Sequence, residues 1–346
     1  MIELLIVGGS AIILIVAGSA VATAMQVLPF AYPAARVRSA KSKMLSDAEL
    51  VEWTHLGYKD ILYHLEKKGY HQILSLIESN FREEKVQNLL RKAQYKDLHA
   101  VSQHVPRKYK KFFSALASRL EIENILSTLR SKTSPSYQRH KIKEILLQTQ
   151  YFKDPSAIES ATLEETLSIL QHTPYAKIIN AHLEEIRNGN LHGLEHALSI
   201  QYYKKLRRES RIDPVLRAYV ALMIDAHNIK KTLCFSQPSF IEGGTLSQTQ
   251  KNQLKEAKNI QEVIQACENT AFADVLKDVK SQTELLQALE RKQKRFAQRL
   301  LKEEPLSIKP IIAYYILRNI ELKNIRILLK LKHARFDQQE IARALI

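Results

Sequence analysis

The chain has 346 residues, a formal net charge of +16, nine glycines and two cysteines. Two distant cysteines exclude a disulfide-stapled fold and favour a reducing setting, and the scarcity of glycine argues against a turn-rich sheet protein. Acids are interleaved with most basic clusters, which is typical of solvated helix faces; contact with acidic proteins or lipid headgroups is the sharper alternative. Nucleic acid is not an expected partner, because no zinc finger, RNA-binding aromatic motif or helix-turn-helix is recognisable.

The first 30 residues predict a membrane anchor. Residues 4–30 contain no charge, and a bilayer needs about 20 residues as helix. A cleaved signal peptide is the alternative, but the preceding Met-Ile-Glu has no basic residue and the apolar stretch is too long for one. We therefore expect a single transmembrane helix within residues 1–30.

Four basic residues directly after this stretch predict its orientation. Only Glu3 precedes the apolar segment, whereas the residues that follow it are basic: Arg36, Arg38, Lys41 and Lys43. Cytoplasmic flanks carry the excess of Lys and Arg. The N-terminus is thus expected outside a cell membrane crossed once, with the body on the cytoplasmic side.

The remaining chain predicts helices throughout, because Leu, Ile, Ala, Glu, Lys and Gln dominate. Pro29 and Pro33 are expected to break the membrane helix, and Ser46 with Glu49 has the spacing of a capping box. We expect helices over residues 34–44, 59–68, 71–78, 83–93, 107–131, 138–151, 163–172, 175–188, 191–209, 214–234, 248–257, 260–268, 272–279, 282–302 and 306–332, and a last one from Asp337.

These helices form three sets. A break near Ser134-Pro135 separates the first set from the second, and the stretch 236–247, which contains Gly243-Gly244, is the clearest linker. The expected units after the anchor are therefore residues 31–134, 135–246 and 247–346. The expected fold class is all-α.

One segment occurs three times, once near the end of each set. The copies are LEIENILSTL (120–129), IDAHNIKKTL (224–233) and IELKNIRILL (320–329). Counted from the Asn, aliphatic residues stand at −8, −4, +1 and +5. The step of five residues turns the apolar stripe by about 140° on a helix. Each of these helices should therefore lie between neighbours and bury one side early and the other later.

Each copy also has an acid three residues before an Asn, so the two side chains are neighbours on the helix. The pairs are Glu121 and Asn124, Asp225 and Asn228, and Glu321 and Asn324. Asn donates and accepts hydrogen bonds, whereas a carboxylate only accepts. We expect a buried or half-buried hydrogen-bonded junction. A catalytic carboxylate is disfavoured, because three equivalent copies have no other chemistry beside them.

The repeated segment resembles the C subunit of archaeal A-type ATP synthases, a family related to the d subunit of vacuolar ATPases. Its members open with a Tyr, an Arg-Val-Arg and a Leu-Ser, which are Tyr32, Arg36 to Arg38, and Leu45-Ser46 here. The third copy, with its lead-in PLSIKPIIAYYILRNIELKNIRILLKLK, matches best, and the resemblance runs from residue 31 to the C-terminus. Two features depart from the family: CFSQPSFIEGG follows the second copy, and many members lack the N-terminal apolar segment.

The resemblance implies a funnel of three similar helical domains with pseudo-threefold symmetry. It implies a non-catalytic subunit without cofactor or metal, which seats the central stalk of a rotary ATP synthase on the membrane proteolipid ring. The implied partners are central-stalk subunits, the proteolipid ring and membrane lipid at the N-terminal helix. Whether the coupled ion is H⁺ or Na⁺, and whether ATP is made or hydrolysed, does not follow from this chain.

Two other functions stay open on the sequence. One is a membrane-anchored α-helical scaffold that binds acidic proteins or lipid headgroups. The other is a zinc hydrolase, because His192, Glu195 and His196 spell H-x-x-E-H, in which two His could share a metal. Gly193 weakens that helix turn and no third-ligand motif follows, so an ordinary polar helix is the preferred interpretation.

Overall fold

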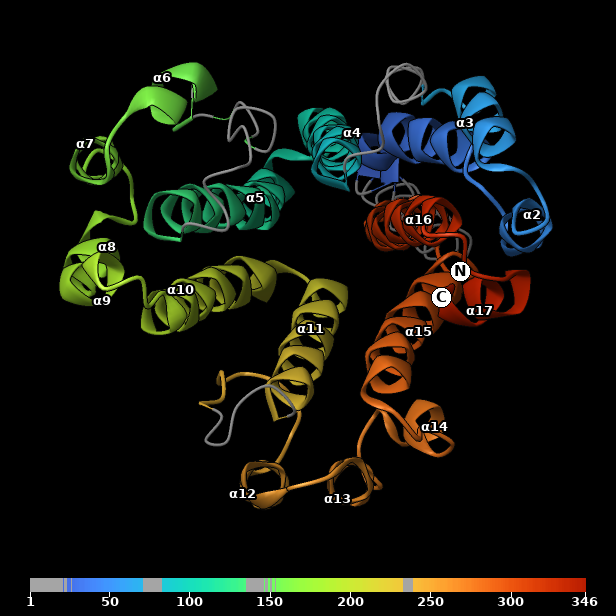
Figure 1. Ribbon diagram of the computed structural model, residues 1–346. Coiled ribbons are helices and arrows are strands. Elements are labelled where there is room, and N and C mark those ends of the chain that lie inside the picture. Colours follow the sequence, from blue (N-terminus) through green and yellow to red (C-terminus); the bar gives the residue numbers. More distant parts are fainter. Residues whose placement is uncertain are drawn as a thin grey trace, which may run out of the picture.

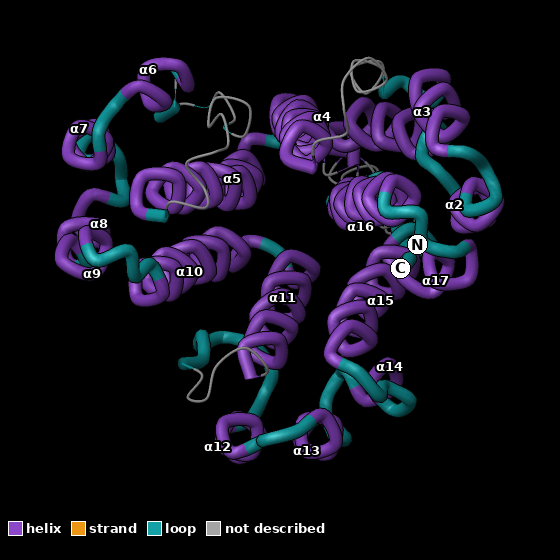
Figure 2. The backbone as a smooth tube through the Cα atoms, in the orientation of Figure 1, coloured by secondary structure: helices purple, strands orange, loops and turns teal. Residues whose placement is uncertain are grey.

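The computed structural model describes residues 27–70, 83–134, 154–232 and 239–346, together with positions 21, 24, 25, 146, 149, 151 and 152. Over these residues the chain consists of helices and loops, without a strand (Figure 2). The predicted all-α class is confirmed for this part of the chain. The helix expected at 71–78 lies outside the described residues.

Most predicted helices are present within a few residues of their expected ends. The first described helix, called the N-terminal helix below, covers residues 27–41. The others are α2 (Asp47–Trp53), α3 (Tyr58–Lys67), α4 (Glu83–His104), α5 (Arg107–Thr133), α6 (Pro155–Ser160), α7 (Leu163–Leu170), α8 (Ala176–Ala181), α9 (Leu183–Arg187), α10 (His192–Glu209), η3 (Ser210–Ile212), α11 (Pro214–Thr232), α12 (Gln248–Glu256), α13 (Ile260–Ala266), α14 (Ala273–Leu276), α15 (Gln282–Leu300), α16 (Lys309–His333) and α17 (Gln338–Ala344).

Six long helices form a closed ring. In the order α4, α5, α10, α11, α15, α16, each helix contacts the next, and α16 contacts α4 again (Figure 1). The three helices with the repeated segment, α5, α11 and α16, alternate with the three others. Each therefore lies between two ring neighbours, as predicted. The shorter helices lie around the outside, α6 to α9 beside α5 and α10, and α12 to α14 beside α11 and α15 (Figure 1).

The expected change of buried face is confirmed on α11 and α16. On α16, Ile316 belongs to a cluster that joins the ring helices, whereas Ile325 and Leu329 belong to a second cluster with α2, α3 and α17. On α11, Ile224 faces the first cluster and Ile229 a third one, built with α12 to α15. The second half of each of these helices therefore buries its apolar side against short outer helices and one ring neighbour, α15 for α11 and α4 for α16.

The apolar cluster that joins the ring helices extends to the end of the ring at which α10 ends and α11 and α16 begin. Leu206 of α10, Leu216 of α11 and Ile312 of α16 are all fully buried in it, although α10 and α16 are not ring neighbours. Burial of aliphatic side chains contributes about 2 kcal/mol each. This end of the ring is a packed floor.

The N-terminal helix is longer than predicted. It continues through Pro29 and Pro33, where the sequence predicted a break before residue 34. A proline removes one backbone hydrogen bond of a helix. Phe30, Ala34 and Val37 recur on one face and are buried to 6% exposure or less, so packing of this face offsets the loss.

The predicted anchor within residues 1–30 lies mostly outside the described residues. Among the residues that the structure does describe, no helix is long and apolar enough to cross a membrane.

The predicted helix ends are confirmed at some positions and wrong at others. The Ser46–Glu49 capping box is present, and Asp213 caps α11 by accepting from the Val215 N–H at 2.8 Å. The helix expected at 138–151 is wrong at its end, because residues 146, 149 and 151 are loop. The helix expected at 175–188 is divided into α8 and α9, and α6 was not predicted, although Asp154 caps it.

Candidate functional site: three hydrogen-bonded joints and a basic inner cleft

The second copy of the repeated segment fixes the linker that follows α11. The Asp225 carboxylate accepts from the Thr245 N–H at 2.7 Å, from its hydroxyl at 2.6 Å and from the Leu246 N–H at 3.3 Å. Asn228 donates to the Ile241 carbonyl and accepts from its N–H, both at 2.8 Å. Residues 241–246 are thereby bound to α11 just before Ser247 caps α12.

Gly243 and Gly244 allow this linker to approach α11. Gly243 has a φ of +106°, a conformation that favours glycine. A Cβ on Gly244 would lie 1.8 Å from Oδ1 of Asp225. The glycine pair that the sequence marked as a turn is therefore also what lets the buried carboxylate reach the Thr245 N–H.

The third copy makes equivalent bonds to two separate parts of the chain. Asn324 donates to the Ile346 carbonyl at 3.1 Å and accepts from its N–H at 3.0 Å. Glu321 accepts from the Leu45 N–H at 2.7 Å. Leu45 precedes Ser46, which caps α2, just as Leu246 precedes Ser247, which caps α12. The joint that one linker forms in the second copy is formed in the third by two residues far apart in the chain, Leu45 and Ile346.

The first copy matches the second at its acid, whereas its Asn has a side-chain partner among the described contacts. Glu121 accepts from the Thr149 hydroxyl at 2.8 Å, as Asp225 does from Thr245. Asn124 accepts from the Arg91 guanidinium at 3.2 Å. All six acid and Asn side chains are at most 8% exposed. We call these three sites the joints.

Burial sets the electrostatics of the joints. It raises the pKa of Asp225 and of Glu321 above their ordinary values, and the hydrogen bonds from Thr245 and from Leu45 oppose this rise. Arg318 contributes beside Glu321: it pairs with Glu321 at 2.6 Å and with Asp97 at 2.7 Å, and it donates to Tyr70. The third joint therefore includes an ion-pair network that connects α16, α4 and the end of α3.

The N-terminal family residues lie together at the packed floor. Arg36 donates to the Tyr32 hydroxyl at 3.1 Å and lies 3.1 Å from Nε2 of His104, whose ring is edge-on to that of Tyr32. Arg38 reaches the Pro305 carbonyl at 3.4 Å. This motif thus joins the N-terminal helix to α4 and to the connection between α15 and α16.

A cleft of about 340 Å³ lies on the inner side of the ring, above the floor. It is formed by residues of α4, α5, α10 and α16, which belong to different sides of the ring. Its charged lining residues are Arg91, Arg119, Glu123, Arg130, Glu195, Lys323 and Arg326. Ion pairs neutralise much of this charge: Arg130 with Glu195 at 2.8 Å, Glu123 with Arg119 at 3.1 Å, and Lys323 with Glu290 of α15. The net charge of the lining remains positive. We call this cleft the inner cleft.

His227 of α11 lies near the inner cleft and has a buried Nε2 with no hydrogen-bond partner among the described residues. Burial, together with Lys231, Arg119 and other nearby cations, lowers the pKa of His227 to about 3. The sequence analysis did not predict a role for His227 or for the charged residues of the inner cleft. The signal was present, since the residue before the Asn is polar in each copy: Glu123, His227 and Lys323.

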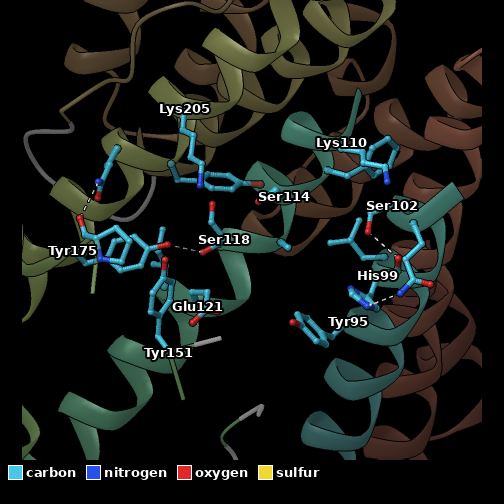
Figure 3. Close-up of a pocket in the computed structure, with 18 residues that line it drawn as sticks. Tyr95, His99, Ser102, Lys110, Ser114, Ser118, Glu121, Tyr151, Tyr175 and Lys205 are labelled. Atoms are coloured by element: carbon cyan, nitrogen blue, oxygen red, sulfur yellow. Dashed lines mark hydrogen bonds between the residues drawn. The ribbon is translucent and has the colours of Figure 1, made fainter. Parts of the chain in front are cut away.

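A second cleft, of about 440 Å³, lies between α4, α5 and α10 (Figure 3). Tyr151 and Tyr175 lie on one side of it near Glu121, with the Tyr175 hydroxyl 3.5 Å from the Ser118 carbonyl. Tyr95 and His99 of α4 lie on the other side (Figure 3). Burial raises the pKa of Tyr175 above its ordinary value. The cleft contacts the first joint, and its described lining holds no nucleophile–base pair that would indicate catalysis.

The H-x-x-E-H residues lie on α10 and are not assembled as a metal site. Glu195 is paired with Arg130, and burial and Lys231 lower the pKa of His196. Over the described residues no group of three or more His, Cys, Asp or Glu side chains is placed to hold a metal ion.

Comparison with known proteins gives a family. A family model described as "ATP synthase (C/AC39) subunit" matches residues 33–344. The chain is 25% identical to the C subunit of the A-type ATP synthase of Methanocaldococcus jannaschii, over 92% of this chain and 86% of that protein. It is 25% identical to the same subunit of Methanosphaera stadtmanae, over 89% and 85%, and 26% identical to that of a Desulfurococcus species, over 88% and 86%.

The match covers the acid and the Asn of all three joints and all six ring helices, and it agrees with the resemblance seen in the repeated segment. The chain therefore belongs to the ATP synthase C/AC39 subunit family.

Proposed function

We propose that this chain seats the central stalk of an A/V-type rotary ATP synthase on the membrane proteolipid ring. It thereby couples ion translocation to ATP synthesis or hydrolysis. The named relatives are subunits of A-type ATP synthases. As a member of this family the chain is a structural subunit, not a catalytic one.

The proposed overall form is a funnel with pseudo-threefold symmetry. Each third would contain one ring pair, α4 with α5, α10 with α11, or α15 with α16, and one joint. The alternation of these helices around the ring and the equivalent bonds of Asn228 and Asn324 support this symmetry. The units 31–134, 135–246 and 247–346 stay a prediction.

The basic inner cleft is the observation that carries the proposal. A ring with a packed floor and an open inner side has the form of a socket. The lining has five basic and two acidic side chains, and this positive balance would attract an acidic foot of the stalk, since complementary charge speeds association and excludes wrong partners. Close-packed helices resist deformation, which a part that transmits torque requires.

The membrane part of the proposal rests on the sequence. Residues 1–30 would anchor the chain with its N-terminus outside, and Arg36, Arg38, Lys41 and Lys43 would lie on the cytoplasmic side. The three described basic residues of the N-terminal helix are exposed, as such a location requires.

Affinity capture from native membranes in mild detergent tests the function. We expect catalytic-head, central-stalk and proteolipid subunits to be recovered together with the tagged chain. Recovery of the chain alone, or with unrelated acidic proteins, would contradict the proposal and favour the membrane-anchored scaffold.

A charge-reversal pair tests the inner cleft. Arg130→Glu with Lys323→Glu should lower recovery of the stalk subunits at least about tenfold, because like charges would then face the stalk. Lys277→Glu, at an exposed position outside the ring, is the control and should leave recovery unchanged. Equal recovery with both variants would place the stalk contact elsewhere.

A further inference from the structure

Three connections between long helices lie at the floor end of the ring. They join α4 to α5, α10 to α11, and α15 to α16. The Tyr109 hydroxyl donates to Asp213 at 2.9 Å and so links the first connection to the second. The N-terminal helix links the first to the third, since Arg36 contacts His104 and Arg38 contacts Pro305. We call residues 104–111, 204–217 and 299–309 the turn end.

The turn end is strongly basic. It contains thirteen Lys and Arg residues and four acids. The acids are occupied within the protein: Asp213 caps α11, Glu209 pairs with Arg208, and Glu303 and Glu304 pair with Lys309. The exposed bases include Lys108, Lys111, Lys204, Arg211, Arg217 and Lys302. Over these residues the floor is therefore covered by a basic surface whose acids already have partners.

An apolar stripe projects from the same end. Phe30 packs against Tyr109 with 5.7 Å between ring centroids, which fixes the N-terminal helix to the start of α5. On the other face, Val21, Met25, Leu28 and Tyr32 are 58%, 72%, 68% and 59% exposed. Their spacing of four, three and four residues keeps them on one side of a helix. No charged residue occurs from residue 4 to residue 35.

We infer that the turn end faces a lipid bilayer and binds the phosphate groups of anionic lipids. The apolar stripe continues an uncharged stretch that is long enough to enter the hydrocarbon of a bilayer. Tyr32 and Arg36 lie at its C-terminal end, and Tyr and Arg are typical of the membrane–water interface. Each base near an anionic surface strengthens the attraction, within a Debye length of about 8 Å. The inference rests on the proposed membrane location and not on the proteolipid contact.

Lysine footprinting of the full-length chain tests this inference without any other subunit. The chain is reconstituted in phosphatidylcholine vesicles, or in vesicles of equal parts phosphatidylcholine and phosphatidylglycerol. It is then labelled with acetic anhydride, which crosses the bilayer, so both orientations react. Mass spectrometry gives the acetylation rate of each lysine.

Lys108, Lys111, Lys204 and Lys302 should react about threefold more slowly on the anionic vesicles, because their ammonium groups are held at phosphates. Lys59 and Lys277, which are exposed away from the turn end, should react equally on both. High salt should remove the difference. Equal rates on both vesicles at the turn end would overturn the inference. Protection that appears only after addition of proteolipid ring would make this surface a protein interface instead.

A matched pair of variants separates charge from the anchor. In Lys108→Glu with Lys111→Glu, the protection of Lys204 and Lys302 on anionic vesicles should fall at least about twofold. Lys59→Glu with Lys277→Glu should leave it unchanged. Circular dichroism verifies that both variants keep their helices. Unchanged protection in the first variant would contradict lipid phosphate binding, whether or not the chain assembles with its proposed partners.

Discussion

Asn228 and Ile241 exchange two hydrogen bonds, from side-chain amide to backbone carbonyl and from backbone N–H to side-chain oxygen, both at 2.8 Å. The amide of Asn presents a donor and an acceptor side by side, which matches one peptide residue. Asn324 makes the same exchange with Ile346. In the second and third copies the Asn is therefore a backbone clamp for a chain segment outside its own helix.

Replacing the clamp by a carboxylate should destabilise the protein strongly. Asn228→Asp keeps an acceptor for the Ile241 N–H, but it loses the donor to the carbonyl and buries a charge beside Asp225. We expect a loss of about 3 kcal/mol in the free energy of unfolding, measured by denaturant unfolding in detergent. Asn252→Asp, at an exposed position of α12, is the control and should change it by less than about 0.5 kcal/mol. Equal effects would mean that the clamp contributes no specific stability.

Gly244 should be the most sensitive glycine of the second joint. A methyl group at Gly244 would displace the buried Asp225 carboxylate and break its bonds to Thr245 and Leu246. We expect Gly244→Ala to lower the free energy of unfolding by about 2–4 kcal/mol. Gly57→Ala, where the nearest atom belongs to the exposed Asp60, should cost about 0.5 kcal/mol. A mild effect at Gly244 would show that the linker moves away from α11 without loss.

The lowered pKa of His227 predicts that the folded state loses stability in acid. Its pKa is lowered from 6.5 to about 3, so the unfolded chain binds the proton first as the pH falls below 6.5, and the folded state loses stability. One such group contributes at most about 1.4 kcal/mol per pH unit. Replacement by Gln removes the titration. Between pH 7 and pH 5 the stability of wild type should therefore fall by about 1–2 kcal/mol more than that of His227→Gln. His172→Gln, an exposed histidine, should follow wild type; parallel curves for all three proteins would refute the buried neutral imidazole.

The lowered pKa of Glu49 predicts a second, smaller loss of stability at more acidic pH. Its bonds to Lys68 and to the Ser46 N–H lower its pKa from 4.5 to about 2. The stabilisation is complete above pH 4.5 and is lost as the pH falls toward 2. Glu49→Gln keeps the capping box but loses the 2.6 Å ion pair with Lys68. Because the pair is partly exposed, we expect a loss below about 1 kcal/mol at pH 7 that disappears at pH 2. If wild type and Glu49→Gln still differ in unfolding free energy at pH 2, the effect comes from packing and not from the ion pair.

Helices and caps were predictable because their causes are local. The boundaries of α10 and α11, the cap by Asp213 and the capping box at Ser46 follow from periodicity and from residue types within one turn. The prediction failed where packing overrides a local rule. The N-terminal helix crosses Pro33 because its buried face holds it, and Thr149 lies in a loop where it reaches Glu121.

The candidate site was predictable only in part. The acid and Asn of each copy were recognised as junction residues, but the segments that they bind were not. The residue pattern of a helix face indicates that the face is buried, but it does not identify the segment that packs against it. The inner cleft was missed altogether. Its charges, such as Arg130 and Glu195, come from separate helices and meet only in the ring.

The sequence by itself determined the all-α class, the positions of the helices, the threefold repeat and the family, since each depends on residue type at short spacing. Only the tertiary structure decided the order of the six helices in the ring, the basic inner cleft and the third joint. There Leu45 and Ile346 together take the places that residues 241–246 fill in the second joint. The physical reason is that hydrogen-bonding capacity is a property of a side chain, whereas the partner that satisfies it is chosen by the packing of the whole chain.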